Sequence, residues 1–297
     1  MRGVLILTIA CALQTVPGVP LPVDRASNVF FARATINGQG PFWMTVDTGA
    51  TLTVLDPATV GRLDLRLRPA DARSDVGVGA RVTPVATTTG ATIVVTGAMP
   101  FRPALLYVVG VRDAEAALGH RIDGVLGHDF LRRFIVEFDY GTGAVRLHPP
   151  GAVVAGESAR VKVRTAGNRL VVPVRLTLSS GEALRARLLI DTGSNSGISL
   201  NTPFAARHRL EERFPSGELS AAVGVNGMTV RAVMRVSGAS IGAVALPATS
   251  VALSRDQVGL SASTEFDGIL GAAVLRHFTM VVDYPRHELA LRRAGER

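Results

Sequence analysis

The sequence predicts an all-β protein that contains two copies of one structural unit. Val, Thr, Ala and Gly are common, whereas aromatic residues make up only 5% of the 297 residues. Val and Thr favour strands, and Gly favours turns. Several motifs recur at a constant spacing, with short predicted strands and only brief helices between them. Many short strands with few helices are typical of an all-β architecture.

The repeat is visible in three pairs of acidic residues. The stretch FWMTVDTGATLTVL is echoed by RLLIDTGSNSGISL, and DGVLGHDF is echoed by DGILGAAV. Each copy is long for a stacking repeat, so we expect two lobes rather than a solenoid. In each pair the acids lie 144 positions apart, the difference between 191 and 47: Asp47 with Asp191, Asp123 with Asp267, and Asp139 with Asp283. We predict a first lobe over residues 28–149, a linker over 150–159 and a second lobe over 160–297.

Both lobes are expected to contain the same elements in the same order. A strand and a turn precede the strand that runs into Asp-Thr-Gly. A brief helix follows, because an Asp, Asn or Thr cap stands beside a proline. A Gly-rich hairpin and an apolar-apolar-Gly element with a short helix complete the lobe. The paired segments are strands 29–36 and 170–178, turns 37–40 and 179–182, helices 55–63 and 200–210, hairpins 75–85 and 221–230, and short helices 129–134 and 272–278.

The N-terminal segment predicts export. Arg2 precedes an apolar run that is too short to span a bilayer and fits the core of a signal peptide, so we expect residues 1–18 to be removed. The mature protein would be periplasmic or secreted, without stable membrane insertion. Cys11, the only cysteine, leaves open a lipid anchor at the N-terminus, and a frayed cytosolic N-terminus is the alternative.

Charge and histidine spacing bear on partners and cofactors. The net charge of +8 is compatible with a nucleic-acid partner, but the arginines are scattered singly, without a basic run or interleaved aromatic residues. We therefore expect general surface charge and no nucleic acid. The six histidines lack the spacing of metal ligands, so we expect no metal and no cofactor.

Asp47 and Asp191 are the candidates for chemistry among the repeated acids. Each follows strongly apolar residues, MTV or LLI, that should draw it into the interior, where a lone charge is costly. The partner of each is therefore expected to be the other. The remaining pairs are expected to have structural roles: exposed turn acids at Asp139 and Asp283, and supports of tight turns at Asp123 and Asp267.

Two carboxyl groups in contact have a defined chemistry. They cannot both ionise easily, so they share one proton. One is then a general base and the other a general acid at the same pH. A water held between them could attack a peptide carbonyl without a metal, a thiol or a cofactor. Gly49 and Gly193 would let the backbone come close to the carboxyl groups.

The tandem motifs resemble those of the aspartic proteases. Each Asp-Thr-Gly is followed by an apolar-apolar-Gly segment, Val125 to Gly127 or Ile269 to Gly271. Two lobes in one chain are similar to pepsin, whereas compact lobes without cysteine are similar to retroviral-type proteases, here duplicated. The resemblance implies a two-lobed acid-protease barrel fold with short helices, in which Asp47 and Asp191 are the catalytic pair. It also implies six supporting residues: Thr48, Gly49, Ala50, Thr192, Gly193 and Ser194.

The resemblance assigns different roles to the residues that follow the two motifs. Thr48 and Thr192 would interlock the lobes. In pepsin-like enzymes the hydroxyl after Asp-Thr-Gly bonds its own aspartate, so Ser194 would favour the ionised form of Asp191. Ala50 has no hydroxyl, which would leave Asp47 with the shared proton.

A Gly-rich hairpin is expected to close over the substrate as a flap. Pepsin-like flaps carry a tyrosine, and neither hairpin has one. We expect a peptide or protein substrate, bound by strand-like pairing, and a monomer that suffices for activity. The alternative is a non-catalytic peptide-binding or regulatory module on the same fold. Either hairpin qualifies as the flap: Gly77, Val78 and Gly79 in the first lobe, or Gly224, Val225 and Gly227 in the second.

Overall fold

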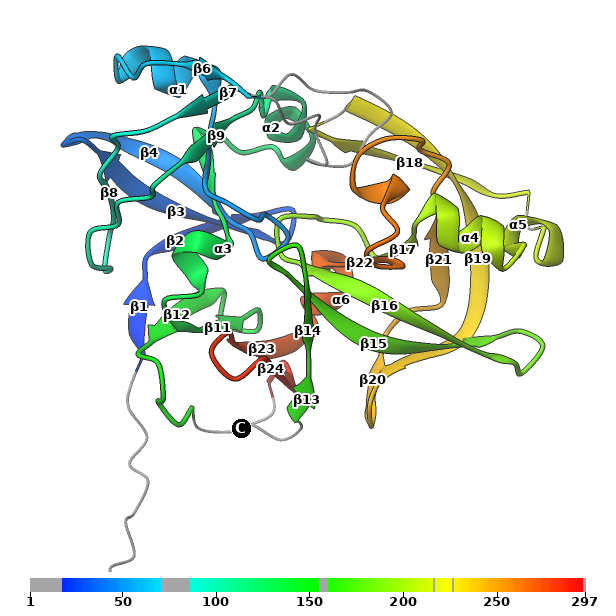
Figure 1. Ribbon diagram of the computed structural model, residues 1–297. Coiled ribbons are helices and arrows are strands. Elements are labelled where there is room, and N and C mark those ends of the chain that lie inside the picture. The colour runs from blue at the N-terminus through cyan, green and yellow to red at the C-terminus, as the bar shows by residue number, and fades with distance from the viewer. Residues whose placement is uncertain (1–17, 71–85, 155–159, 216, 226, 296–297) are drawn as a thin grey trace, which may run out of the picture.

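The protein is mostly β-strand with a few short helices, which confirms the predicted all-β, two-lobed class (Figure 1). The structure is a computed structural model that describes residues 18–70, 86–154, 160–215, 217–225 and 227–295. Each lobe has a nine-stranded sheet, and a six-stranded sheet contains strands from both lobes. Within the described ranges, no helix has the length and apolar character needed to cross a bilayer.

The first lobe is built on a sheet with the strand order β2-β3-β4-β10-β5-β9-β7-β6, in which β8 pairs with β3. Its strands are β2 (Val23–Ala26), β3 (Val29–Ile36), β4 (Gln39–Val46), β5 (Val54–Leu55), β6 (Arg68–Pro69), β7 (Ala86–Thr88), β8 (Ile93–Val95), β9 (Leu106–Val108) and β10 (Gly124–Leu126). Its helices are α1 (Pro57–Arg62), α2 (Arg112–Leu118) and α3 (His128–Leu131).

The second lobe repeats this plan in the order β14-β15-β16-β22-β17-β21-β19-β18, with β20 paired to β19. Its strands are β14 (Arg164–Ala166), β15 (Arg169–Leu178), β16 (Ala183–Asp191), β17 (Ile198–Leu200), β18 (Leu219–Gly224), β19 (Gly227–Ile241), β20 (Val244–Leu246), β21 (Ser250–Leu253) and β22 (Gly268–Gly271). Its helices are α4 (Thr202–Arg207), α5 (Leu210–Arg213), the 3-10 helix η1 (Leu260–Ala262) and α6 (Ala272–Leu275).

The shared sheet joins the lobes and lies below the first-lobe sheet in Figure 1. Its order is β1-β12-β11-β23-β24-β13, so β11 of the first lobe pairs directly with β23 of the second. Its strands are β1 (Val19–Leu21), β11 (Ile135–Asp139), β12 (Ala144–His148), β13 (Arg160–Lys162), β23 (Phe278–Asp283) and β24 (Glu288–Arg293). The paired strands β1 and β2 begin before residue 28, the predicted start of the first lobe. The signal peptide and the other domain boundaries stay predictions.

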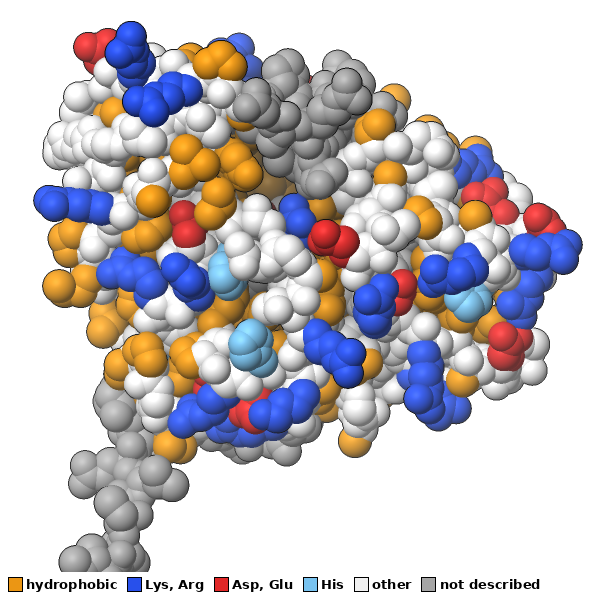
Figure 2. Space-filling model, viewed as in Figure 1, with side chains coloured by type: hydrophobic (Ala, Val, Ile, Leu, Met, Phe, Trp, Pro, Cys, Tyr) orange, Lys and Arg blue, Asp and Glu red, His pale blue; other side chains and the backbone are white. Residues whose placement is uncertain are grey.

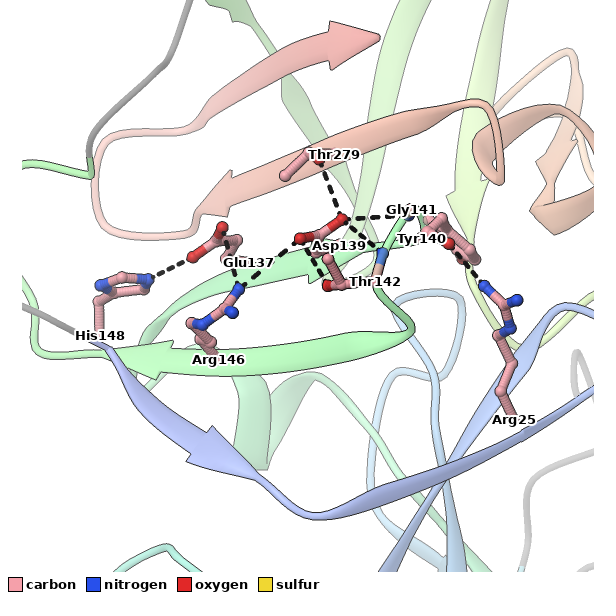
Figure 3. Close-up of polar contacts among 9 residues, drawn as sticks. All are labelled: Arg25, Glu137, Asp139, Tyr140, Gly141, Thr142, Arg146, His148 and Thr279. Carbon is pink, nitrogen blue, oxygen red and sulfur yellow. Dashed lines mark hydrogen bonds and ion pairs between the residues drawn. The ribbon is translucent and has the colours of Figure 1, made fainter. Parts of the chain in front are cut away.

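The shared sheet corrects the prediction of exposed turn acids. Asp283 is 3% exposed, and the Asp139 side chain is 14% exposed. Figure 3 shows Asp139 bonded to the backbone N–H groups of Gly141 and Thr142, and also to the hydroxyl of Thr279 on the neighbouring lobe. These acids do stabilise turns, but their turns lie in a sheet made by both lobes, which the sequence of either lobe alone does not reveal.

The first hairpin shows how the sequence sets the local fold. Asn37 and Gly38 both have positive φ, 50° and 78°, as a tight two-residue turn between strands requires. The turn aligns β3 with β4, and Phe30, Phe31 and Phe42 on these strands are fully buried. The strand β4 then delivers Asp47 to the boundary between the lobes.

Candidate active site

The structure brings Asp47 and Asp191 together. Asp47 directly follows β4, and Asp191 ends β16. Their carboxyl groups are within hydrogen-bonding reach of each other. Asp191 is 6% exposed, and Asp47 is partly exposed toward the cleft between the lobes.

Thr48 and Thr192 link the two loops reciprocally. The Thr48 hydroxyl donates to the carbonyl oxygen of Ile190 at 2.6 Å, and the Thr192 hydroxyl donates to that of Val46 at 2.8 Å. Each hydroxyl also accepts the backbone N–H of the other threonine, at 3.1 Å in both cases. Both side chains are buried. Four buried hydrogen bonds between lobes therefore fix one aspartate relative to the other.

The two motif glycines permit this close approach. A Cβ atom on Gly49 would lie 2.8 Å from Cγ of Asp191, and one on Gly193 would lie 2.4 Å from Cγ of Asp47. The same glycines donate backbone N–H groups to their own aspartates, at 2.6 Å for Gly49 and 3.0 Å for Gly193. Any side chain at these positions would collide with the opposite carboxyl group.

The apolar-apolar-Gly segments support the loops from beneath. Strand β10 runs parallel to β4, and β22 runs parallel to β16. A Cβ atom on Gly127 would lie 2.4 Å from the carbonyl oxygen of Leu52, and one on Gly271 would lie 2.4 Å from that of Ser196. Only glycine lets these strands pass so close to the loops that follow the aspartates.

Asp123 and Asp267 brace neighbouring strands rather than tight turns, which corrects the sequence-based expectation. Asp123 accepts the backbone N–H of Trp43 at 2.8 Å, and Asp267 accepts that of Arg187 at 2.8 Å. Both acids are buried. They tie the strand that leads into each aspartate to the apolar-apolar-Gly strand beside it.

Burial raises the pKa of both central carboxyl groups. For Asp191 the charge of Asp47 adds to this effect, so its pKa lies well above the ordinary value. For Asp47 the effect of burial is opposed by the N–H group of Gly49, the hydrogen bond with Asp191 and the positive charge of Arg169. Both raised pKa values favour one proton shared by the pair, and the positive charge of Arg169 favours the ionised form of Asp47.

The hydrogen bonds do not supply the asymmetry between the two aspartates that the family resemblance implied. The Ser194 hydroxyl bonds the Ser196 hydroxyl at 2.8 Å instead of the Asp191 carboxyl group. Ser194 and Ala50 both contribute backbone N–H groups to their aspartates, so the missing hydroxyl at Ala50 makes little difference. The positive charge near Asp47 comes from Arg169, a residue outside both motifs.

The second-lobe hairpin reaches across the cleft. It consists of β18 and β19, and its Gly224 and Val225 line the cleft. Val225 packs against an apolar cluster of the first lobe that includes Val111, Leu118 and Ile122. Gly227 begins β19 with a φ of 86°. The first-lobe alternative, Gly77, Val78 and Gly79, lies outside the described residues.

The walls of the cleft differ in polarity. Figure 2 shows one face of the molecule, on which Lys and Arg side chains are spread without one continuous basic patch. The first lobe lines the cleft mainly with apolar residues, among them Val54, Tyr107, Val109, Val111, Leu118 and Ile122. The second lobe contributes a more polar set that includes Arg169, Ser194, Asn195, Ser196, Ser199 and Arg231.

Sequence reasoning missed the two arginines of this cleft. It assigned the arginines to the surface, yet Arg169 and Arg231 are only 8% and 7% exposed. Arg169 donates from Nε to the carbonyl oxygen of Gly49 at 3.1 Å. Along β19 the apolar residues Met228 and Val230 are exposed while Arg231 is buried, so the alternation in the sequence provides no signal for this arginine. Within the described residues, no group of three or more His, Cys, Asp or Glu side chains could hold a metal ion.

Comparison with known families finds a match within the first lobe. Residues 32–130 match the model of a family described as Aspartyl protease. The matched range contains the first Asp-Thr-Gly motif and the Val125–Gly127 segment, and it ends before the second lobe. A search of curated proteins found no match to the chain.

Proposed function

We propose that the protein is an aspartic endopeptidase whose catalytic pair is Asp47 and Asp191, and the match of residues 32–130 to an aspartyl protease family of the retropepsin-like kind supports this. The observation that carries this proposal is the contact between the two carboxyl groups, one from each lobe, held by the reciprocal threonine bonds. A structural pair of acids would have no need of a cleft at this position, whereas both aspartates line one.

The reaction uses the proton that the pair shares. Ionised Asp47 takes a proton from a water held between the carboxyl groups, and the water oxygen attacks the peptide carbonyl carbon. Protonated Asp191 gives its proton to the carbonyl oxygen, which forms a tetrahedral diol. The C–N bond then breaks as the leaving nitrogen receives the proton from Asp47 and a diol hydroxyl returns a proton to Asp191. Both aspartates end in their starting states.

The β18–β19 hairpin is the flap of this proposal. An extended peptide would lie between the hairpin and the two Asp-Thr-Gly loops, and it would pair with exposed backbone groups as an added strand. Opening would require Val225 to leave its apolar contacts on the first lobe. A single chain contains both aspartates, so a monomer suffices. Export to the periplasm or the medium stays part of the proposal.

The test is cleavage of a mixed peptide library, with and without a statine-type transition-state mimic. We expect cleavage by the wild type, inhibition by the mimic and no cleavage by Asp47→Asn. The competing function is a non-catalytic peptide-binding module on the same fold. Binding of the mimic without cleavage of any peptide across pH 3 to 8 would favour that module and reject the endopeptidase.

A further inference from the structure

The underside of the β18–β19 hairpin carries a buried arginine that faces the cleft. Arg231 lines the cleft although it is only 7% exposed. Its Nε atom is buried without a hydrogen-bond partner, and within the described part of the chain its side chain makes no hydrogen bond or close ion pair. An arginine presents five N–H donors in a fixed plane, so this site holds an unused set of directed donors.

The surroundings of Arg231 leave further polar atoms unmatched. Ser220 lies directly opposite Arg231 in the hairpin, and its hydroxyl is buried without a partner. Asp256 uses one carboxylate oxygen to accept the Thr229 hydroxyl, while its other oxygen has no partner. The negative charge of Asp256 favours the charged form of Arg231, and burial opposes it. The buried Nε of this guanidinium therefore lacks an acceptor, although the nearby carboxylate of Asp256 favours its charged form.

Such an arrangement lowers the stability of the folded protein. Buried polar groups are almost always hydrogen-bonded. A charged donor that loses its hydration without gaining an acceptor raises the free energy of the folded state. Arg169, the other arginine of the cleft, already donates to Gly49 and acts on Asp47. Arg231 has no comparable role in the catalytic pair. Its donors are thus available to a bound substrate.

We propose that Arg231 forms a subsite for an acidic side chain of the substrate, so that the enzyme prefers peptides with Glu or Asp near the scissile bond. A carboxylate matches the planar fork of a guanidinium with two parallel hydrogen bonds, which a neutral amide cannot reproduce. The first-lobe wall, with Val111, Leu118 and Ile122, would hold an apolar residue of the same peptide. This inference rests on the proposed function, because it names the substrate class of that cleft.

The first experiment compares paired peptides. Each pair has Glu or Gln at one position, and the position is moved along the peptide on both sides of the scissile bond. At one position we expect kcat/KM to favour Glu over Gln by at least tenfold in the wild type. Arg231→Gln should reduce this ratio to near one. Arg231→Lys, which keeps the charge but loses the fork, should give an intermediate ratio. Equal rates for Glu and Gln peptides at every position would overturn the subsite while leaving the endopeptidase intact.

The matched control is Arg235→Gln. Arg235 lies on the same strand, but its side chain is 63% exposed and paired with Glu218 at 2.8 Å. Its loss should leave the Glu preference unchanged. If Arg231→Gln fails to fold, Arg231→Lys and the wild type still supply the comparison.

A second experiment separates this inference from the endopeptidase itself. Asp47→Asn should bind peptides without cleaving them, so calorimetric titration of this variant with the Glu and Gln peptides would measure the subsite alone. Tighter binding of the Glu peptide by at least tenfold, lost in the Asp47→Asn, Arg231→Gln double variant, would support the subsite even if no peptide were cleaved. Equal affinities would reject it.

Discussion

The two lobes keep the same backbone around the aspartates but line the cleft differently. The hydrogen bonds that position Asp47 and Asp191 are repeated almost bond for bond, as the two threonines show. The cleft walls are not repeated, since the first lobe supplies apolar side chains where the second supplies serines and arginines. Duplication thus preserved the symmetry that the paired carboxyl groups require. Different walls are what the proposed peptide binding requires, because a peptide has a direction and would present different side chains to each lobe.

The loops behind the aspartates differ in the same way. In the first lobe Asp129 accepts the backbone N–H of Thr53 at 2.8 Å and its hydroxyl at 2.7 Å. The positions 144 residues later are Ala273 and Gly197, where the Ala273 N–H donates to a backbone carbonyl oxygen instead. At this position a side chain holds the loop in the first lobe, and a backbone hydrogen bond takes its place in the second.

The largest expected effect is a loss of kcat that should be the same for the catalytic aspartate of either lobe. Asp47→Asn and Asp191→Asn should each lower kcat by at least about 100-fold, because each removes one partner of the acid–base pair. Steady-state assays on one peptide would measure this. A variant that keeps more than about a hundredth of wild-type kcat would contradict the shared mechanism.

The same variants should be as stable as the wild type or more so at neutral pH. Burial raises the pKa of both aspartates in the folded protein, so folding disfavours their ionised forms. The stability that the protonated carboxyl groups provide is present at low pH and is lost as the pH rises through the raised folded pKa values. Asn stays neutral and avoids that loss. Thermal unfolding at several pH values should show the difference from wild type shrinking toward acid pH.

The next largest effects on stability and activity are expected from substitutions that place an added side chain between the two lobes. Gly193→Ala places a Cβ atom 2.4 Å from Asp47, and Gly49→Ala places one 2.8 Å from Asp191. Overpacking of this kind costs about 1–3 kcal/mol of unfolding free energy. We expect both variants to lose activity, with Gly193→Ala the less stable. Denaturant unfolding and peptide cleavage would measure the two effects.

Gly61→Ala is the control for these glycine variants. Gly61 lies in α1, and a Cβ atom there would have no neighbour within 4 Å. Alanine in a helix should stabilise the protein by about 0.5–1 kcal/mol. Activity should be unchanged. Equal stabilities of all three glycine variants would show that the close approach at the aspartates does not constrain the protein.

The fold and the central pair could be predicted because the repeat encodes them locally. Asp-Thr-Gly and its preceding apolar strand specify a buried acid in each lobe, and the constant spacing of 144 residues indicates that the lobes correspond. The buried arginines could not be predicted, since Arg169 and Arg231 become cleft residues only when distant strands come together. The burial of Asp283 depends in the same way on a sheet that both lobes build.

A smaller effect is expected from the side chain that holds the first-lobe loop. Asp129→Ala would leave the buried N–H and hydroxyl of Thr53 without their acceptor, at a cost of about 1–3 kcal/mol of unfolding free energy. Asp129→Asn keeps an acceptor oxygen, and burial already raises the pKa of Asp129. This variant should therefore have nearly the same free energy of unfolding as the wild type. Denaturant unfolding would compare them. Equal losses in both variants would mean that the carboxylate charge, not the acceptor, holds the loop.

The smallest and most specific effect concerns Arg169, which gives the two aspartates different environments. The strand registers pair Phe31 with Thr45 and Val171 with Leu189, so Arg169 corresponds to Val29 of the first lobe. Val29 is fully buried and apolar. The second lobe therefore places a positive charge near Asp47, and the first lobe has no charge at the equivalent position.

Removal of this charge should shift one side of the pH profile. Arg169 lowers the pKa of Asp47, so Arg169→Met should raise it and favour the fully protonated, inactive pair. The acidic limb of kcat/KM should then move to higher pH, while Arg169→Lys should restore part of the wild-type position. Ser194→Ala should leave that limb in place, because the Ser194 hydroxyl bonds Ser196. Arg175→Met, an exposed position on the same strand, is the control. A limb that moves with Ser194→Ala but not with Arg169→Met would place the source of asymmetry back in the motif itself, and the protonated member of the pair would then be Asp47.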